Sequence, residues 1–211
     1  MSTPLVTTKA RVRHGAAWLA RHLDRLTHGR LTPNMVTYAG FAMHLPIAVL
    51  IATGHNLWAA GLLVVFGLFD TLDGELARLQ KRAGPRGMLL DASTDRMKEV
   101  LLYSGAGYAL ALGEHPATAA WAVAACGASL CVSYVKAKGE AAIASVESGR
   151  KGIPHATLNR MFADGLLSFE IRMAVLVVGL LAGQLVWAVA AIAVLAAFTA
   201  FQRLIRISRA L

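Results

Sequence analysis

Four aspartates follow an apolar stretch, residues 31–69, that contains no Asp, Glu, Lys or Arg. They are Asp70, Asp73, Asp91 and Asp95. Carboxylates that crowd a low-dielectric site cannot all stay ionised unless cations neutralise them. Carboxylate oxygens favour hard divalent ions such as Mg²⁺ or Mn²⁺, and two ions that share a bridging carboxylate can clamp a diphosphate. These residues therefore predict a site for two divalent metal ions.

The spacing of the aspartates predicts that two neighbouring helices carry them. At about 100° per residue, the first pair shares one face of a helix over residues 57–80 with two small residues. The second pair forms an i, i+4, i+8 row with a glycine on a helix over residues 86–112. A short turn that ends at Pro85 makes the helices antiparallel, so their acidic faces meet. The two faces carry Asp70, Asp73, Gly74 and Ala77 on the first helix, and Gly87, Asp91 and Asp95 on the second.

The composition of the whole chain is typical of a membrane protein. Hydrophobic residues make up 56% and charged residues 16% of the chain, and the mean hydropathy is +0.55. Soluble domains carry about 25% charged residues. Charge-free runs and the Gly, Pro and polar residues between them predict an all-α polytopic membrane protein with six transmembrane helices. The spans are expected near 33–53, 57–80, 86–112, 116–138, 163–182 and 184–206, with a turn at Gly183-Gln184.

Basic residues orient these spans. They crowd the N-terminal segment, residues 78–86, residues 136–160 and the C-terminal tail, whereas the other turns have none. The positive-inside tendency then places both termini and the acidic site on the cytoplasmic side of the cell membrane. Residues 1–30 are expected to form an amphipathic juxtamembrane segment with an interfacial helix, and residues 31–211 one six-helix domain with a mobile loop over 139–160. The formal charge of +9 indicates anionic membrane lipids as partners rather than nucleic acid.

The aspartates and their neighbours resemble the signature of the CDP-alcohol phosphotransferase family in order and in spacing. The resemblance implies a membrane transferase that moves a phosphatidyl group from CDP-diacylglycerol to an alcohol acceptor and releases CMP. It also implies two Mg²⁺ or Mn²⁺ ions and a homodimer. The matching positions are Asp70-x2-Asp73-Gly74-x2-Ala77-Arg78-x8-Gly87-x3-Asp91-x3-Asp95.

The resemblance further implies roles for single residues. Asp70, Asp73 and Asp91 would hold the metal ions, and Asp95 would be a further ligand or the general base that accepts the hydroxyl proton. The CDP-lipid would lie against small residues, polar residues and a guanidinium group. These are Asp70, Gly74, Ala77, Arg78 and Gly87, with Thr32, Asn34 and Thr37 from a segment that is common in the family. The alternative for the small residues is that they only pack helices, and for the arginine that it only anchors a helix at the membrane boundary.

Three basic residues indicate the acceptor. Residues 133–140 resemble a segment of the phosphatidylinositol phosphate synthases within this family, and Arg172 lies where those enzymes carry an arginine. Lys136, Lys138 and Arg172 would therefore bind the phosphate of an acceptor such as inositol 1-phosphate. The segment before Arg172 lacks further charged residues that are common in the family, so glycerol 3-phosphate and another polyol are alternative acceptors. The alternative is a purely structural role, in which these side chains anchor helices at the membrane interface.

A function of a different class is also compatible with charged residues in a membrane. Acidic and basic side chains within spans mark ion pathways, so a small ion or proton transporter is the alternative. A pathway would distribute polar groups through several spans toward both sides of the membrane. The aspartates gather at one side instead, so the sequence favours the transferase.

Overall fold

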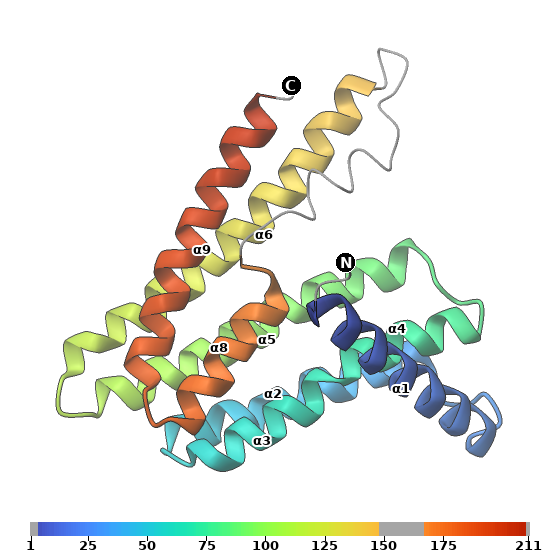
Figure 1. The fold of residues 1–211 in the computed structure, drawn as a ribbon, viewed down its shortest axis with the longest axis horizontal. Coiled ribbons are helices and arrows are strands. Elements are labelled where there is room, and N and C mark those ends of the chain that lie inside the picture. Colours follow the sequence, from blue (N-terminus) through green and yellow to red (C-terminus); the bar gives the residue numbers. More distant parts are fainter. Residues whose placement is uncertain (1–3, 148–166, 210–211) are drawn as a thin grey trace. The chain divides into compact units, whose positions relative to one another are not determined.

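The computed structural model describes residues 4–147 and 167–209, and every regular element within these ranges is a helix (Figure 1). The prediction of an all-α protein is thus confirmed for the described residues. The described residues divide into two compact units: unit 1 comprises residues 4–51 and 57–102, and unit 2 comprises residues 52–56, 103–147 and 167–209. In chain order the elements are α1 (Pro4–Leu26), α2 (Pro33–Ala52), α3 (Asn56–Gly67), α4 (Phe69–Leu79), α5 (Pro85–Ala111), the 3₁₀-helix η1 (Pro116–Thr118), α6 (Ala119–Glu147), α8 (Phe169–Leu181) and α9 (Leu185–Ser208).

In unit 1, α1 packs against α4. Leu72 and Leu76 lie one helical turn apart on α4, and both are buried in an apolar cluster with Ala20 of α1 and Val36 of α2. Burial of this leucine face stabilises the packing through the hydrophobic effect and fixes the rotation of α4 about its axis. The directions in which the aspartates of α4 point are set by the same rotation.

The side-chain amide of Gln80 ties the end of α4 to the chain around α1. Its Nε2 donates to Oδ1 of Asp24 at 2.7 Å and to the backbone carbonyl oxygen of Leu31 at 2.9 Å. Both acceptors are partly buried, so each hydrogen bond satisfies a group that has lost access to water. The residue that directly follows α4 therefore holds both α1 and the connection from α1 to α2.

The single helix predicted over residues 57–80 is divided into α3 and α4, which meet at Leu68. Gly67 directly precedes this break, and glycine is a poor helix former because it has the most backbone freedom to lose. The break brings Phe69 against α2, where a Cβ added at Gly40 would lie 3.3 Å from the Phe69 Cβ. Glycine at position 40 therefore allows α2 and the start of α4 to approach closely.

The short turn predicted between the two acidic helices is confirmed. The chain leaves α4 after Leu79, and Lys81 has a φ of 54°, which reverses its direction. Pro85 is the first residue of α5. Proline suits this position because its fixed φ fits a helix and its missing N–H would have no partner inside the helix.

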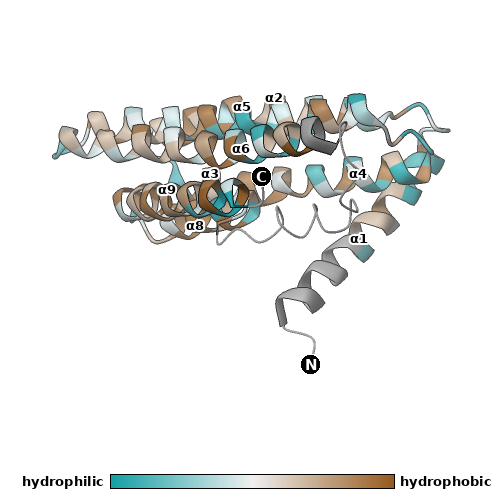
Figure 2. Ribbon diagram, turned by 90° about the horizontal axis from the view of Figure 1, so that it is seen from above, coloured by the Kyte–Doolittle hydropathy of each residue, from teal (hydrophilic) through white to brown (hydrophobic). Residues whose placement is uncertain are grey.

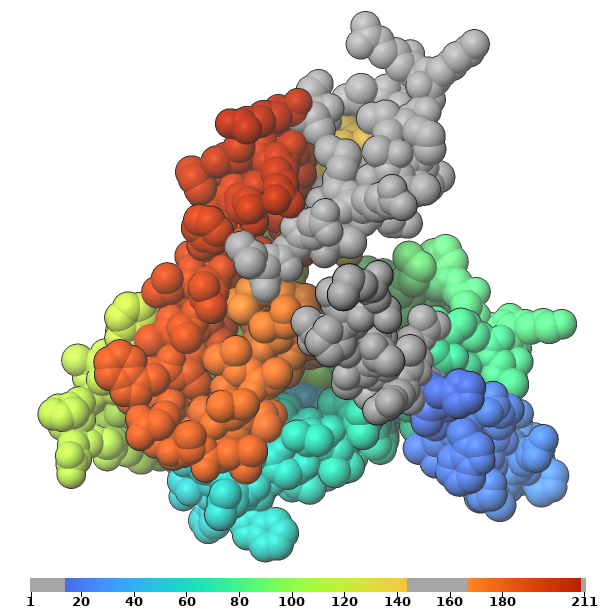
Figure 3. Space-filling view, in the orientation of Figure 1, coloured from blue at the N-terminus to red at the C-terminus, as the bar shows by residue number. Residues whose placement is uncertain are grey.

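In unit 2, α9 packs along α6 and also against α8, as Figure 3 shows for α8 in orange and α9 in red. A Cβ added at Gly179 of α8 would overlap the Ala188 Cβ of α9, so only glycine permits this approach. Gly183 has a φ of 65° in the turn between the two helices, a conformation that favours glycine. The turn predicted at Gly183-Gln184 is thus confirmed.

The fourth predicted span, residues 116–138, ends before helix α6 does. Helix α6 continues to Glu147, so Lys136 and Lys138 lie within a helix rather than at its end. The loop predicted over residues 139–160 is wrong for residues 139–147, which are helical, while residues 148–160 lie outside the described residues. The reason is the helix propensity of the run EAAIASVE, whose Ala and Glu residues extend a helix after it has left the apolar stretch.

Within the described residues, four helical segments are long and apolar enough to cross a membrane. They are Pro33–Ala52, Asn56–Leu79, Pro116–Ile143 and Leu185–Ser208. Figure 2 shows hydrophobic residues along α3 and α9 and hydrophilic ones where α4 ends. Large apolar side chains point outward, among them Trp187 and Val123, each 72% exposed, as lipid-facing side chains would be. Two predicted spans are not among these four segments. The helix of one, α8, has only 13 residues, and the helix of the other, α5, carries acidic residues, so the number of six spans stays a prediction.

Candidate active site

Three of the four predicted acids come together in unit 1. Asp70 of α4 and Asp91 and Asp95 of α5 each place a carboxylate oxygen within 4.8 Å of the others. Oδ1 of Asp91 is buried and has no hydrogen-bond partner among the described residues. A buried carboxylate oxygen without a partner is costly, and a hard cation would satisfy it. This oxygen-only ligand set therefore fits Mg²⁺ or Mn²⁺.

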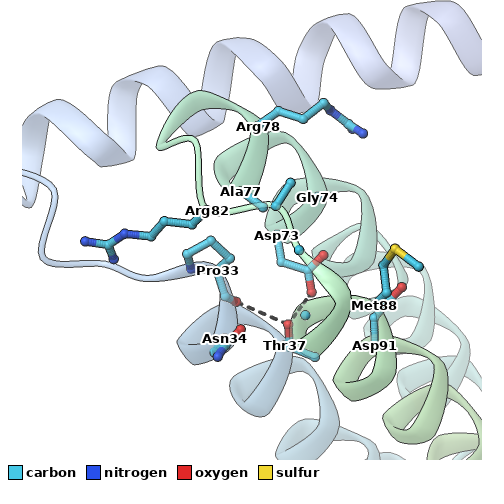
Figure 4. Close-up of a pocket in the computed structure, with 13 residues that line it drawn as sticks. Pro33, Asn34, Thr37, Asp73, Gly74, Ala77, Arg78, Arg82, Met88 and Asp91 are labelled. Atoms are coloured by element: carbon cyan, nitrogen blue, oxygen red, sulfur yellow. Dashed lines mark hydrogen bonds between the residues drawn. The ribbon is translucent and has the colours of Figure 1, made fainter.

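Asp73, the fourth predicted acid, lies outside this group of three. Its side chain is buried, and its Oδ2 accepts a hydrogen bond from Oγ1 of Thr37 at 2.5 Å (Figure 4). Thr37 belongs to α2, so this contact joins α2 to α4. Asp73 and Asp91 line the same cavity, which keeps Asp73 beside the acid group. The sequence predicted both Thr37 and Asp73 as site residues but not the hydrogen bond between them.

The acid group also contains a cation that sequence reasoning missed. Lys98 of α5 is fully buried, and its Nζ donates to Oδ1 of Asp70 and, at 3.2 Å, to Oδ1 of Asp95. The signal was available, because Lys98 follows Asp95 by three residues and so shares its helical face. We call Asp70, Asp91, Asp95 and Lys98 the acid cluster.

A cavity of about 340 Å³ adjoins the acid cluster, and Figure 4 shows the residues around it. A Cβ added at Gly87 would meet no atom within 4 Å, and one added at Gly74 would meet only Nη2 of Arg78 at 3.6 Å. Contacts among the described residues therefore do not explain these two glycines, and both line the cavity. The predicted lipid-site residues that line the cavity are Asn34, Thr37, Gly74, Ala77, Arg78 and Gly87.

The other predicted residues of this site have different surroundings. Oγ1 of Thr32 accepts a hydrogen bond from the backbone N–H of Met35 at 3.3 Å, so it caps the start of α2. Arg78 binds Glu75 at 2.7 Å and extends away from the carboxylate of Asp73 in Figure 4. Arg82, which was not predicted, also lines the cavity. Its position four residues after Arg78 was the signal that could have found it.

The predicted acceptor residues lie in unit 2 and differ in burial. Arg172 is 1% exposed, and its Nη1 donates to the carbonyl oxygen of Leu167 at 2.8 Å. Lys136 is about half exposed with its Nζ 3.9 Å from Glu140, and Lys138 is exposed with its Nζ 5.9 Å from the centre of the Tyr134 ring. The two lysines thus have exposed side chains, whereas the arginine is buried.

A second buried arginine, which the sequence did not predict, accompanies Arg172. Arg203 of α9 is 8% exposed, and its Nη1 donates to the carbonyl oxygen of Val132 at 3.3 Å. Its Nε is buried and has no hydrogen-bond partner among the described residues. Arg172 lies on α8, which packs against α9. We call Arg172 and Arg203 the arginine pair; two neighbouring buried guanidinium groups form a site that favours an anion.

The sequence of this chain is similar to those of curated proteins from bacteria and archaea. Phosphatidylinositol phosphate synthase of Corynebacterium glutamicum is 32% identical over 179 residues, which are 83% of this chain and 77% of that protein. Archaetidylinositol phosphate synthase of Methanothermobacter thermautotrophicus is 30% identical over 181 residues, 83% of this chain and 82% of that protein.

Solved structures share the fold. Phosphatidylinositol phosphate synthase of Mycobacterium tuberculosis with CDP-DAG bound superimposes with a TM-score of 0.74 at 25% identity, over 91% of this chain and 92% of that one. The same enzyme in complex with manganese and citrate gives a TM-score of 0.75 over 92% and 88%.

A family-wide comparison covers most of the chain. The sequence model of one family, described as CDP-alcohol phosphatidyltransferase, matches residues 30–198, a range that holds the acid cluster, the cavity and Arg172. The apolar helices agree with an integral membrane protein. This chain therefore belongs to the CDP-alcohol phosphatidyltransferase family.

Proposed function

We propose that this enzyme transfers a phosphatidyl group from CDP-diacylglycerol to inositol 1-phosphate and releases CMP. The observation that carries the proposal is a group of three aspartates whose carboxylate oxygens lie within 4.8 Å of one another, beside a cavity of about 340 Å³. That volume lies within the range of small-molecule sites. The names of the relatives support the acceptor, and the relative solved with CDP-DAG supports the donor. Family membership leaves the transporter alternative without support.

Two divalent ions, Mg²⁺ or Mn²⁺, are the cofactors in this proposal. Asp70, Asp73 and Asp91 would hold them, with Asp95 beside them as a further ligand. Bound ions would neutralise the diphosphate of the donor and the charge that develops on the departing CMP. The unpartnered Oδ1 of Asp91 and the manganese in the solved relative support this assignment.

Asp95 is the proposed general base. It accepts the proton of the acceptor hydroxyl, whose oxygen attacks the phosphorus atom that bears the diacylglycerol. The bond from that phosphorus to the bridging oxygen of CMP breaks, and CMP leaves with this oxygen. Oδ1 of Asp95 accepts a hydrogen bond from Lys98 at 3.2 Å, and Oδ2 lies 3.8 Å from Nη2 of Arg96.

The CDP-lipid is proposed to occupy the cavity of unit 1. Gly74, Ala77 and Gly87 line the cavity and leave room for it, because a Cβ at Gly87 would meet no atom within 4 Å and one at Gly74 would meet only the end of the Arg78 side chain. Arg78 and the newly found Arg82 supply positive charge, and Asn34 and Thr37 supply polar contacts. Asp70 and Thr32 would act at the edge of this site, since neither lines the cavity.

The phosphate of the acceptor is proposed to bind in unit 2. Arg172 would be its main contact, with Lys136 and Lys138 as more exposed partners. The buried, unpartnered Nε of Arg203 supports an anion at this place, and Arg203 joins the proposed set. A phosphorylated acceptor would supply the negative charge that these side chains bind.

The membrane arrangement is part of the proposal. One domain over residues 31–211 would cross the cell membrane six times, with both termini and the active site on the cytoplasmic side. Residues 1–30 would lie along the membrane surface and bind anionic lipids. The exposed apolar side chains of Trp18 and Leu26 beside the exposed Arg21 and Arg25 on α1 support this. The enzyme would act as a homodimer.

An acceptor panel tests the function. Purified protein in detergent receives CDP-diacylglycerol, Mg²⁺ and one of three alcohols: inositol 1-phosphate, glycerol 3-phosphate or free inositol. We expect rapid CMP release with inositol 1-phosphate alone. Faster release with glycerol 3-phosphate would replace the acceptor, and faster release with free inositol would remove the need for a phosphorylated one.

A further inference from the structure

Lys98 is a buried cation that no step of the proposed transfer uses. Its side chain is 0% exposed, and it contacts one oxygen of Asp70 and, at 3.2 Å, one oxygen of Asp95. Asp70 belongs to α4, whereas Asp95 and Lys98 belong to α5. The ammonium group therefore joins the two helices that carry the proposed metal ligands.

The two contacts of Lys98 are made to residues that divalent ions would also bind. A buried ammonium group is stable only where opposite charges and hydrogen bonds replace its water shell, and these two carboxylates provide them. In return the ammonium group reduces the electrostatic repulsion among three aspartates whose carboxylate oxygens lie within 4.8 Å of one another. A metal ion that enters the acid cluster meets this positive charge and a pair of oxygens already engaged in hydrogen bonds.

We propose that Lys98 is the resident cation of the acid cluster, and that divalent metal ions compete with it for Asp70 and Asp95. The inference rests on the metal site of the proposed function. Lys98 stabilises the metal-free protein, because it neutralises part of the cluster. It weakens metal binding for the same reason, because an entering ion must displace the ammonium from at least one carboxylate oxygen.

The test measures Mn²⁺ binding and thermal unfolding in Lys98→Met, which keeps the length of the side chain but removes its charge. Free Mn²⁺ is followed by electron paramagnetic resonance in detergent, at fixed pH and without substrate. We expect the Kd for Mn²⁺ to fall about ten-fold, the lower end of what a hydrogen bond to a charged group contributes. We also expect a lower melting temperature in chelator than for the wild type, and a smaller difference in saturating Mn²⁺.

Lys81→Met is the matched control, because it removes the same charge from an exposed position just after α4. It should change neither the Kd nor the effect of Mn²⁺ on the melting temperature. Unchanged or weaker Mn²⁺ binding in Lys98→Met overturns the proposal. So does a failure of both Lys98→Met and Lys98→Gln to fold when Mn²⁺ is present throughout purification, because the metal would then not replace the lysine.

The readouts separate this proposal from the proposed transfer. A variant that can be purified only with Mn²⁺ agrees with the resident-cation role. A wild type that binds Mn²⁺ but releases no CMP with any acceptor refutes the transfer alone. A wild type and a variant that both fail to bind Mn²⁺ refute the metal site, and this inference with it.

Discussion

The acid cluster of unit 1 and the arginine pair of unit 2 accommodate buried charge differently. In the acid cluster, a lysine lies among the carboxylates, so charges of both signs belong to one group. In unit 2, Arg172 and Arg203 each donate to a backbone carbonyl oxygen, and Nε of Arg203 has no hydrogen-bond partner among the described residues. The first site already contains a cation that offsets part of its negative charge, whereas the second has a buried donor that the proposed acceptor phosphate would satisfy.

Removing metal ions should have the largest effect and tests the acidic side of this comparison. Excess chelator is expected to abolish CMP release, and Mg²⁺ or Mn²⁺ to restore it. Without cations, the negatively charged carboxylates and the negatively charged diphosphate would repel each other. Ca²⁺ should restore little activity, since it takes more ligands in a looser geometry. CMP release with CDP-diacylglycerol and inositol 1-phosphate is the measurement. Full activity in chelator would contradict the two-metal proposal.

Asp95→Asn tests whether one member of the acid cluster moves a proton. Asparagine keeps the shape of the side chain but cannot accept the hydroxyl proton, so CMP release should fall at least about 100-fold. Glu114→Gln is the control, because it makes the same kind of change at an exposed acid that is not among the predicted site residues. Turnover near that of the wild type in Asp95→Asn would show that another group is the base.

Arg172→Lys tests the basic side. Lysine keeps the charge but loses the planar fork, so the KM for inositol 1-phosphate should rise about ten- to a hundred-fold. The KM for CDP-diacylglycerol should move much less. Arg206→Lys, at an exposed position of α9, is the matched control. If neither Arg172→Lys nor Arg203→Lys changes the acceptor KM in a folded protein, the phosphate assignment of the arginine pair fails.

Gly87→Ala is expected to have the smallest effect and tests the cavity beside the acid cluster. The added Cβ meets no protein atom within 4 Å, so the melting temperature should stay the same or rise, while the KM for CDP-diacylglycerol increases about ten-fold. Gly61→Ala is the control, since it also adds a Cβ in open space but outside the cavity. Equal KM values in the two variants would show that the lipid does not approach Gly87.

The acidic side could be predicted because its residues are close in sequence. The four aspartates, the small residues and the short turn before Pro85 lie on two consecutive helices, so helical spacing alone placed their faces together. Lys98 was missed because its burial depends on packing that helical spacing does not contain. Helical spacing also does not contain the contact of Asp73, which lies outside the group of three, with Thr37 in another helix.

The basic side was harder to predict because distant segments form it. Most of α8, a turn and most of α9 separate Arg172 from Arg203 in the sequence, and only the packing of α8 on α9 relates the two. The end of α6 was predicted too early for another reason. Hydropathy indicates where the apolar run of residues ends, whereas helix propensity decides where the helix itself ends.

The hydrogen bonds of Gln80 bear on how this enzyme can be shortened for laboratory work. A chain that begins at Leu31 would retain every predicted site residue, but it would lack Asp24, one of the two acceptors of the Gln80 amide. It would also lack Ala20, which covers Leu72 and Leu76 on the helix that carries Asp70. Truncation at this point would expose the leucine face of α4 to detergent and weaken the packing that fixes the rotation of this helix. Segments that look dispensable as membrane anchors are therefore best kept when material is prepared for crystallisation.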